Sequence, residues 1–326
     1  MVRILITLAA AFVLGLAIGK VLLPALRALK AGQSIREIGP KWHASKAGTP
    51  TMGGILFILA ALVCVAAAWP AMRRGDYGHL YVFGFSLVFG VIGFLDDFVK
   101  VRYHRNLGLT ALQKFVLQLA AAGCYLLLLR WSGHLSAEMY IPFANVTVPI
   151  PWPVYLIFAM FVIVGCVNAV NLTDGVDGLA ASVTVPVLVF FLAVSVAAQQ
   201  LGLSLFCAAL IGGLLAFLVY NFHPAKMFMG DTGSLFLGGA VCGLAFALDV
   251  PLVLILVGII YIIETLSVIL QVSYFKLTHG KRIFRMTPIH HHFEMGGWSE
   301  VKIVAVFTAV TVVMCVLAWL GVMGRY

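Results

Sequence analysis

Charged residues are scarce in this chain. Only 10% of its 326 residues are Asp, Glu, Lys or Arg, whereas an average soluble domain carries about 25%. Hydrophobic residues make up 63% of the chain and form continuous runs long enough for a helix to cross a lipid bilayer. This composition excludes a soluble globular domain. The length of the runs also excludes a β-barrel, whose strands would read as short alternating segments.

Three common signatures of chemistry are also missing. The sequence has no glycine-rich P-loop, which argues against a nucleotide site of that type. It has no C-x-x-C pair and no His/Cys set at zinc spacing, so neither a disulfide framework nor a thiolate metal site is indicated. The cysteines all fall inside apolar runs and are expected to be small core residues. They are Cys64, Cys124, Cys166, Cys207, Cys242 and Cys315.

The apolar runs predict an all-α polytopic membrane protein, with residues 1–326 forming one integral-membrane domain. The first run, Met1–Leu23, is too long for a signal peptide and no A-x-A cleavage site follows it, so we expect an uncleaved span. About ten transmembrane helices are expected. Their approximate ranges are 3–24, 52–69, 79–98, 111–130, 153–170, 176–197, 203–221, 233–249, 252–275 and 301–321.

Basic residues are distributed unequally between the two sides of this layout. Five of the Lys and Arg residues fall on one side (Arg3, Arg73, Arg74, Arg130 and Arg325), and Lys20 lies within the first span. The other fifteen follow odd-numbered spans: Arg27, Lys30, Arg36, Lys41, Lys46, Lys100, Arg102, Arg105, Lys114, Lys226, Lys276, Lys281, Arg282, Arg285 and Lys302. The positive-inside rule makes that side cytoplasmic and both termini extracytoplasmic. On the outer side, Tyr140–Trp152 is β-branched, bounded by prolines and typical of a small hairpin or extended loop.

The segment Asn168–Gly178 combines polar side chains with glycines between two apolar runs. A continuous helix could not aim all four polar groups at one ligand, because four steps of three residues drift about half a turn. Glycines allow the backbone to break and re-aim the second half. A polar loop that caps the next helix is the alternative to a binding site. The four polar residues are Asn168, Asn171, Asp174 and Asp177, and the glycines are Gly175 and Gly178.

Three carboxylates are expected on the same face as this segment. Asp96 and Asp97 end the third span and should have different partners, since adjacent helical residues point about 100° apart. Lys100 can neutralise only one of them, which favours a metal or a basic substrate group as the second partner. Asp231 opens the eighth span, where a helix cap is the structural alternative. Mg²⁺ is held by one or two carboxylates together with substrate phosphates, which fits this set.

Two further loops on this face are rich in polar groups. Lys41–Gly54 combines lysines, hydroxyls and glycines just before a helix, which suits an anionic group, although contact with lipid headgroups explains it equally well. His290, His291 and His292 are consecutive, so they point apart and cannot all bind one ion on a regular helix. Imidazoles that contact phosphate oxygens fit the basic surroundings better. Glu264, in mid-span, is expected to face the bundle interior in a structural or functional role.

Together these features indicate a Mg²⁺-dependent reaction on a phosphate or diphosphate at a membrane surface. The chain also resembles the phospho-N-acetylmuramoyl-pentapeptide transferases of the polyprenyl-phosphate N-acetylhexosamine-1-phosphate transferase superfamily. The Asp-Asp and Asn/Asp motifs are typical of the superfamily, and the Thr-Pro-Thr-Met-Gly-Gly and His-His-His-Phe-Glu runs are typical of the muramoyl-pentapeptide branch. The matching motifs are Lys46-x-Gly-Thr-Pro-Thr-Met-Gly-Gly54, Asp96-Asp97, Asn168–Gly178, Met229–Ser234 and Pro288–Glu294.

This resemblance implies transfer of phospho-MurNAc-pentapeptide from UDP-MurNAc-pentapeptide to undecaprenyl phosphate, giving lipid I and UMP. It implies Mg²⁺, a cytoplasm-facing site in the bacterial cytoplasmic membrane, the lipid bilayer as surroundings and a homodimer, with no nucleic-acid partner. The expected catalytic residues are Asp96, Asp97, Asp231 (also the Mg²⁺ ligand) and His290. The expected substrate-binding residues are Lys46, Thr51, Lys100, Lys114, Asn168, Asn171, Leu172, Asp174, Gly175, Asp177, Asn221, Phe228 (stacking on uracil), His291 and His292.

Several alternatives stay open at this point. A sister transferase would use UDP-GlcNAc or a related sugar on the same lipid, and a transporter could also carry charged groups in helix breaks. The sequence does not choose between direct attack by the lipid phosphate and a covalent aspartyl intermediate. Family members often carry a basic residue where this chain has Leu112, and Lys114 is a candidate to replace it.

Overall fold

The computed structural model describes residues 1–29, 46, 48–103 and 107–326, and the chain is almost entirely helical. Among the described residues, nine helices are long and apolar enough to cross a membrane. They are α1 (Val2–Ala28), α5 (Gly78–Arg102), α6 (Ala111–Trp131), α7 (Trp152–Thr173), α8 (Leu179–Ala197), α9 (Leu201–Asn221), α10 (Gly230–Ala247), α12 (Ile259–Leu277) and α14 (Glu300–Val322). These helices make the chain a multi-pass membrane protein.

The second predicted span, 52–69, is not one long helix. It consists of α2 (Ile55–Ala61) and α3 (Val63–Ala67), followed by the short α4 (Trp69–Met72). Its start is displaced because Gly53 and Gly54 use their N–H groups outside any helix, donating to the carbonyls of Phe228 (2.8 Å) and Met229 (3.0 Å). At the other end, Pro70 can only enter a new first turn. Nine of the about ten expected spans are therefore long helices among the described residues, and the second is a shorter apolar segment, Ile55–Ala67.

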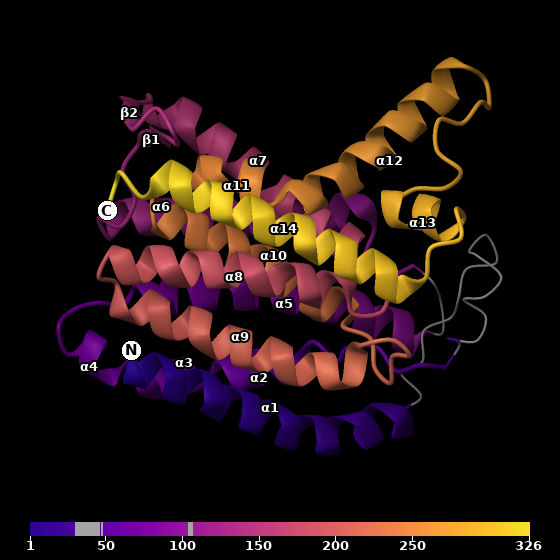
Figure 1. Cartoon of the computed structure of the whole chain (residues 1–326), viewed down its shortest axis with the longest axis horizontal. Helices are drawn as coiled ribbons and strands as arrows, with labels where there is room; N and C mark the ends of the chain where they lie inside the picture. The colour runs from indigo at the N-terminus through magenta and orange to yellow at the C-terminus, as the bar shows by residue number, and fades with distance from the viewer. Residues whose placement is uncertain (30–45, 47, 104–106) are drawn as a thin grey trace.

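The ninth predicted span, 252–275, is also interrupted. A 3₁₀ turn, η2 (Pro251–Val253), and the short α11 (Leu254–Val257) precede a break at Gly258, after which α12 begins. In Figure 1, α12 leans away from the other helices, and the short α13 (Ile289–Glu294) lies beneath its far end. The break thus directs the last turns of α12 and the loop that follows it toward one end of the bundle.

Helices α9 and α10 form the centre of the bundle. In their apolar windows 83% and 89% of residues are buried, against 28% in α1, α6 and α12. Glycines let the neighbours of α10 approach closely, as small residues do between membrane helices. A Cβ on Gly238 would lie 2.6 Å from Cα of Val167 in α7, and one on Gly239 would lie 3.1 Å from Cα of Ser86 in α5. Helix α10 is therefore held between the two helices that end at the polar segments.

The two ends of the bundle differ in character. Both chain termini and the antiparallel hairpin of β1 (Glu138–Ile141) and β2 (Val146–Pro149) lie at one end (Figure 1). This confirms the hairpin predicted around Tyr140–Trp152, with Glu138 paired to Pro149. The C-terminal ends of α5, α7, α9 and α12 lie at the opposite end. The chemically rich connections therefore meet at one end, as the alternation of spans predicted.

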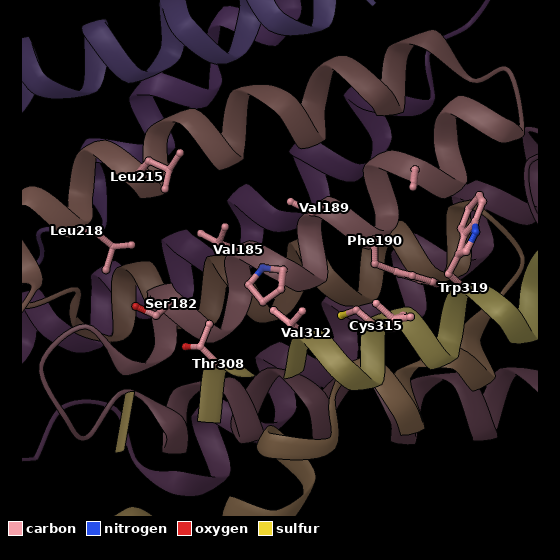
Figure 2. Close-up of a pocket in the computed structure, with 13 residues that line it drawn as sticks. Ser182, Val185, Val189, Phe190, Leu215, Leu218, Thr308, Val312, Cys315 and Trp319 are labelled. Atoms are coloured by element: carbon pink, nitrogen blue, oxygen red, sulfur yellow. The ribbon is translucent and has the colours of Figure 1, made fainter. Parts of the chain in front are cut away.

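All six cysteines are free, and four of them are buried as expected. Cys124 on α6 is exposed and Cys166 is half-buried, so the expectation that every cysteine lies in the core was wrong for these two. An apolar groove of about 610 Å³ runs between α8, α9 and α14 (Figure 2). Its lining includes Pro186, Val189 and Val312, with no Asp, Glu, Lys, Arg or His. The acidic and basic groups that could carry chemistry therefore lie elsewhere.

Candidate active site

Three carboxylates converge where the end of α5 meets the start of α10. Asp96, Asp97 and Asp231 each contribute an oxygen within 4.8 Å of the others. Nζ of Lys100 lies 2.6 Å from Asp96, 2.9 Å from Asp231 and 3.9 Å from Asp97. Nζ of Lys114 on α6 lies 2.8 Å from the same Asp231 oxygen. We call these five residues the carboxylate cluster. Lys100 thus contacts all three acids, but its single positive charge balances only one of them, in line with the expectation from the sequence.

Asp96 and Asp97 have different partners, as predicted from their adjacent positions. Asp96 accepts the backbone N–H of Leu109 at 2.8 Å. Asp97 accepts both the backbone N–H and the hydroxyl of Thr232, each at 2.8 Å. Asp97 therefore ties the end of α5 to the first turn of α10, which fixes the position of the neighbouring Asp231.

Two glycines make this approach possible. A Cβ on Gly93 of α5 would overlap the backbone carbonyl of Asp231, so a larger residue would separate the two helices. Gly230 has a φ of +72°, which favours glycine, and a Cβ there would lie 2.5 Å from an Asp97 carboxylate oxygen. The carboxylate cluster thus depends on glycine at both contact points.

The segment Asn168–Gly178 breaks as predicted. Helix α7 ends at Thr173, and α8 begins after Gly178, whose φ is +77°. Asn171 donates to Asp231 at 2.7 Å and to Ser234 at 2.8 Å, so it contacts the carboxylate cluster. Asn168 instead donates through its amide to Gln118 on α6 at 2.7 Å and to the carbonyl of Val164 at 2.8 Å.

Asp174 follows directly after the end of α7. Burial raises the pKa of its carboxyl well above the usual range, and the negative charge of Asp231 adds to the shift, with smaller contributions from two further aspartates. A raised pKa favours the neutral carboxyl, which can donate a hydrogen bond. Asp174 therefore differs in character from the charge-paired Asp231 nearby.

The end of this segment belongs to a second polar cluster. Nζ of Lys46 lies 2.7 Å from both Asp177 and Glu300, the first residue of α14. His223 lies 3.1 Å from Asp177 and 3.6 Å from Glu300 through Nδ1. These four residues form the Lys46 cluster. Sequence reasoning predicted Lys46 and Asp177 but missed the other two. The available signal was that both lie in connections that follow an odd-numbered span, His223 just after the seventh span (203–221) and Glu300 just before the tenth (301–321).

The other residues expected near the nucleotide lie along the same end of the bundle. Asn221 accepts the N–H of Gly178 at 3.1 Å and donates to the carbonyl of Met227 at 2.9 Å. Phe228 is half-buried, and its N–H donates to the carbonyl of Pro50 at 2.8 Å, next to the buried Thr51. The expected loop residues 41–45 and 47 lie outside the described residues. Of the remaining candidates, Leu172 is half-buried. At the position where family members often carry a basic residue, the side chain of Leu112 is exposed, and Lys114 contacts Asp231.

The three histidines on α13 face three different partners, as predicted for consecutive residues. His290 is fully buried, with Nδ1 3.0 Å from Glu264. His291 lies 2.6 Å from Glu294, and Nδ1 of His292 accepts the N–H of Arg285 at 3.1 Å. Glu264 is itself fully buried, as expected for an acid that faces the bundle interior.

His290 is joined to the other polar groups through the Asn168–Gly178 segment. A Cβ on Gly175 would overlap Nε2 of His290, so this ring nitrogen lies directly against the segment. Asn171 contacts the carboxylate cluster, Gly175 contacts His290 and Asp177 contacts the Lys46 cluster. Eleven residues of sequence therefore link all three groups.

Comparison with known proteins identifies the family of this chain. The family model described as Glycosyl transferase family 4 matches residues 79–249. Phospho-N-acetylmuramoyl-pentapeptide-transferase signature 1 matches residues 46–58. The phospho-N-acetylmuramoyl-pentapeptide-transferase of Clostridium acetobutylicum is 49% identical over 306 residues, covering 93% of this chain and 94% of its own length. The chain belongs to the phospho-N-acetylmuramoyl-pentapeptide-transferase family.

Other members of this transferase family agree over nearly the whole chain. The protein of the same name from Clostridium perfringens is 48% identical over 319 residues, covering 97% of this chain and 98% of its own length. That from Listeria monocytogenes is 45% identical over 312 residues, with 96% of each chain covered. Within this transferase-family chain, the signature covers Lys46 and Thr51, and the family 4 match covers all three carboxylates. The histidine helix α13 lies beyond both matches and is covered by the full-length relatives.

Proposed function

We propose that this chain transfers phospho-MurNAc-pentapeptide from UDP-MurNAc-pentapeptide to undecaprenyl phosphate, giving lipid I and UMP. The observation that carries the proposal is the carboxylate cluster, in which three acids and two lysines meet at one end of an apolar helix bundle. Cations and hydrogen-bond donors that stabilise charge, rather than a covalent apparatus, are what phosphoryl transfer requires of a protein. Membership of the transferase family supports the identity of both substrates.

The donor set of the cluster fits Mg²⁺. Carboxylate oxygens are the ligands that this ion prefers, and the three aspartates can each present one within 4.8 Å of the others. Asp231 is the proposed ligand, because it is shared by both lysines and by Asn171, at the centre of the contacts. Bound there with the diphosphate, Mg²⁺ would neutralise negative charge on the departing UMP.

The protein's own groups would position the two phosphates. Lys100 and Lys114 supply positive charge beside Asp231, and Asp96 or Asp97 sets the position of the lipid phosphate. An oxygen of that phosphate attacks the β-phosphorus of the donor, and the bond from this phosphorus to the bridging oxygen breaks, releasing UMP. At neutral pH the lipid phosphate is already largely ionised, so no strong base is needed.

The nucleoside and the amino sugar of the UDP donor would bind beside the carboxylate cluster, along residues at the same end of the helix bundle. Phe228 offers a half-buried ring for stacking on uracil, beside Thr51 and Asn221. Lys46, Asp174, Gly175 and Asp177 would contact the sugar and phosphate groups. By the positive-inside rule this end faces the cytoplasm, with both termini outside. The chain would act in the bacterial cytoplasmic membrane as a homodimer.

The test is UMP release by the purified protein in detergent, with undecaprenyl phosphate as acceptor and Mg²⁺ present. We expect release from UDP-MurNAc-pentapeptide and little from UDP-GlcNAc. A preference for UDP-GlcNAc would identify a sister transferase instead. No release from any UDP-sugar would reject the enzyme proposal and favour transport, which the polar groups would then serve.

A second measurement separates direct attack from a covalent route. In a single turnover with donor labelled in its β-phosphate and no lipid acceptor, the covalent route leaves label on an aspartate of the protein. Direct attack leaves the protein unlabelled until acceptor is added, when the label passes straight to lipid.

A further inference from the structure

Glu264 and His290 form a buried pair inside the protein. Both side chains are fully buried, and one carboxylate oxygen of Glu264 lies 3.0 Å from Nδ1 of His290. The same oxygen accepts the backbone N–H of His290 at 3.4 Å. The approach to Nδ1 is close, although it is not aligned as a hydrogen bond. Two contacts from one carboxylate oxygen therefore fix where His290 sits.

A carboxyl group in the middle of a membrane helix requires such a partner. Burying an unpaired charge among apolar side chains is costly, and intramembrane acids normally pair or mark a functional path. Among the described residues, the second carboxylate oxygen of Glu264 and Nε2 of His290 have no hydrogen-bond partner. One carboxylate oxygen of Glu264 therefore makes all the polar contacts of the pair, and Nε2 is a buried polar atom without a partner among the described residues.

Nδ1 faces Glu264, so Nε2 is the ring nitrogen left for another partner. Nε2 carries a proton when the pair is a carboxylate with an imidazolium, or a carboxylic acid with a neutral imidazole whose Nδ1 accepts. In these arrangements Nε2 presents an N–H toward Gly175, in the segment that also contacts the carboxylate cluster.

We propose that Glu264 is a positioning residue that holds the ring and the proton of His290 so that Nε2–H donates to a phosphate oxygen of the donor substrate. This inference rests on the proposed function for the identity of the anion. Glu264 itself is not placed to touch the substrate, because it contacts Nδ1, whereas the segment that meets the carboxylate cluster lies against Nε2. Its effect on the reaction must therefore pass through His290.

The experiment is a double-mutant cycle with E264Q, which keeps side-chain volume and polarity, and H290N, which removes the imidazole ring and keeps a polar side chain. We expect E264Q to lower kcat for UMP release at least tenfold, with KM for the donor changed less than threefold. In the H290N background, E264Q should change kcat less than twofold, because the histidine through which it acts is gone. T265V is the matched control on α12: its hydroxyl is buried without a partner among the described residues, and the variant should match wild type.

Two results would overturn the proposal: full kcat in E264Q, or the same loss of kcat in the wild-type and H290N backgrounds. Thermal unfolding of each variant identifies a loss that is only structural, since E264Q should unfold near the wild-type temperature. If the wild-type protein releases no UMP, the proposed function fails, and the pair is then tested by ¹⁵N NMR of histidine-labelled protein. The signals that are missing from the H290N spectrum belong to His290. These signals should shift in E264Q and stay unshifted in T265V. Unshifted signals would reject the pair.

Discussion

Substitution of Gly93 by alanine tests how the carboxylate cluster is assembled. The new methyl group would overlap the backbone carbonyl of Asp231, which cannot rotate away as a side chain could. Overpacking of this kind costs about 1–3 kcal/mol, and a backbone neighbour places G93A near the upper limit. With roughly 2–4 °C per kcal/mol for chains of 150–250 residues, we expect an apparent Tm lowered by roughly 5 °C or more.

The effect on activity should exceed the effect on stability. Separating α5 from α10 moves Asp96 and Asp97 away from Asp231, and a displacement of about 1 Å can reduce the rate on the order of 100-fold. The control is G84A in the same helix, where a Cβ meets nothing within 4 Å. Because alanine is favoured over glycine in a helix by about 1 kcal/mol, G84A should be as stable as wild type or more stable.

The assays are thermal unfolding in detergent and the initial rate of UMP release, measured on the same preparations. If G93A matched G84A within 1 °C and twofold in rate, the close contact of α5 with Asp231 would be wrong, and with it the geometry of the cluster.

Two further predictions concern the nucleotide and the opposite end of the protein. F228A should raise KM for the UDP donor roughly 10- to 100-fold, since stacking on a base contributes about 1–3 kcal/mol. The control F222A removes an exposed ring nearby and should leave KM unchanged. Equal KM values for the two variants would reject stacking. Burial raises the pKa of Asp249, which also accepts a hydrogen bond from Ser136 at 3.0 Å, so the folded protein retains a proton that the unfolded chain releases. The free energy of unfolding should therefore fall as pH rises from the pKa of Asp249 in the unfolded chain to its raised pKa in the folded protein. D249N, measured by thermal unfolding against pH, should lack this decrease. An unchanged pH dependence in D249N would contradict the burial of the charge.

Local patterns predicted much of the fold. Apolar length identified the nine long helices, and their alternation predicted that the polar connections would meet at one end. The glycines of Asn168–Gly178 predicted the break between α7 and α8, because a helix of that composition could not aim its polar groups together. These features depend on neighbouring residues, which a single sequence displays directly.

The features that sequence reasoning missed depend on distant contacts. The second span starts late because Gly53 and Gly54 bond to a segment about 175 residues further along the chain. Lys46 meets Glu300 across 254 residues of sequence, and nothing near either residue indicates the other. Asn168 and Asn171 belong to the same run of polar residues spaced three apart, yet Asn168 contacts Gln118 whereas Asn171 contacts Asp231. The two residues lie about one helical turn apart and therefore have different neighbours.

The central claim is that the three carboxylates hold one magnesium–diphosphate site. The most direct measurement is the rate of UMP release as a function of Mg²⁺ concentration, for wild type and for D231N. We predict that chelation with EDTA abolishes release by wild type, that Mg²⁺ restores it, and that D231N stays inactive at Mg²⁺ concentrations that saturate wild type. Full turnover by D231N at low Mg²⁺, or by wild type in EDTA, would contradict the account.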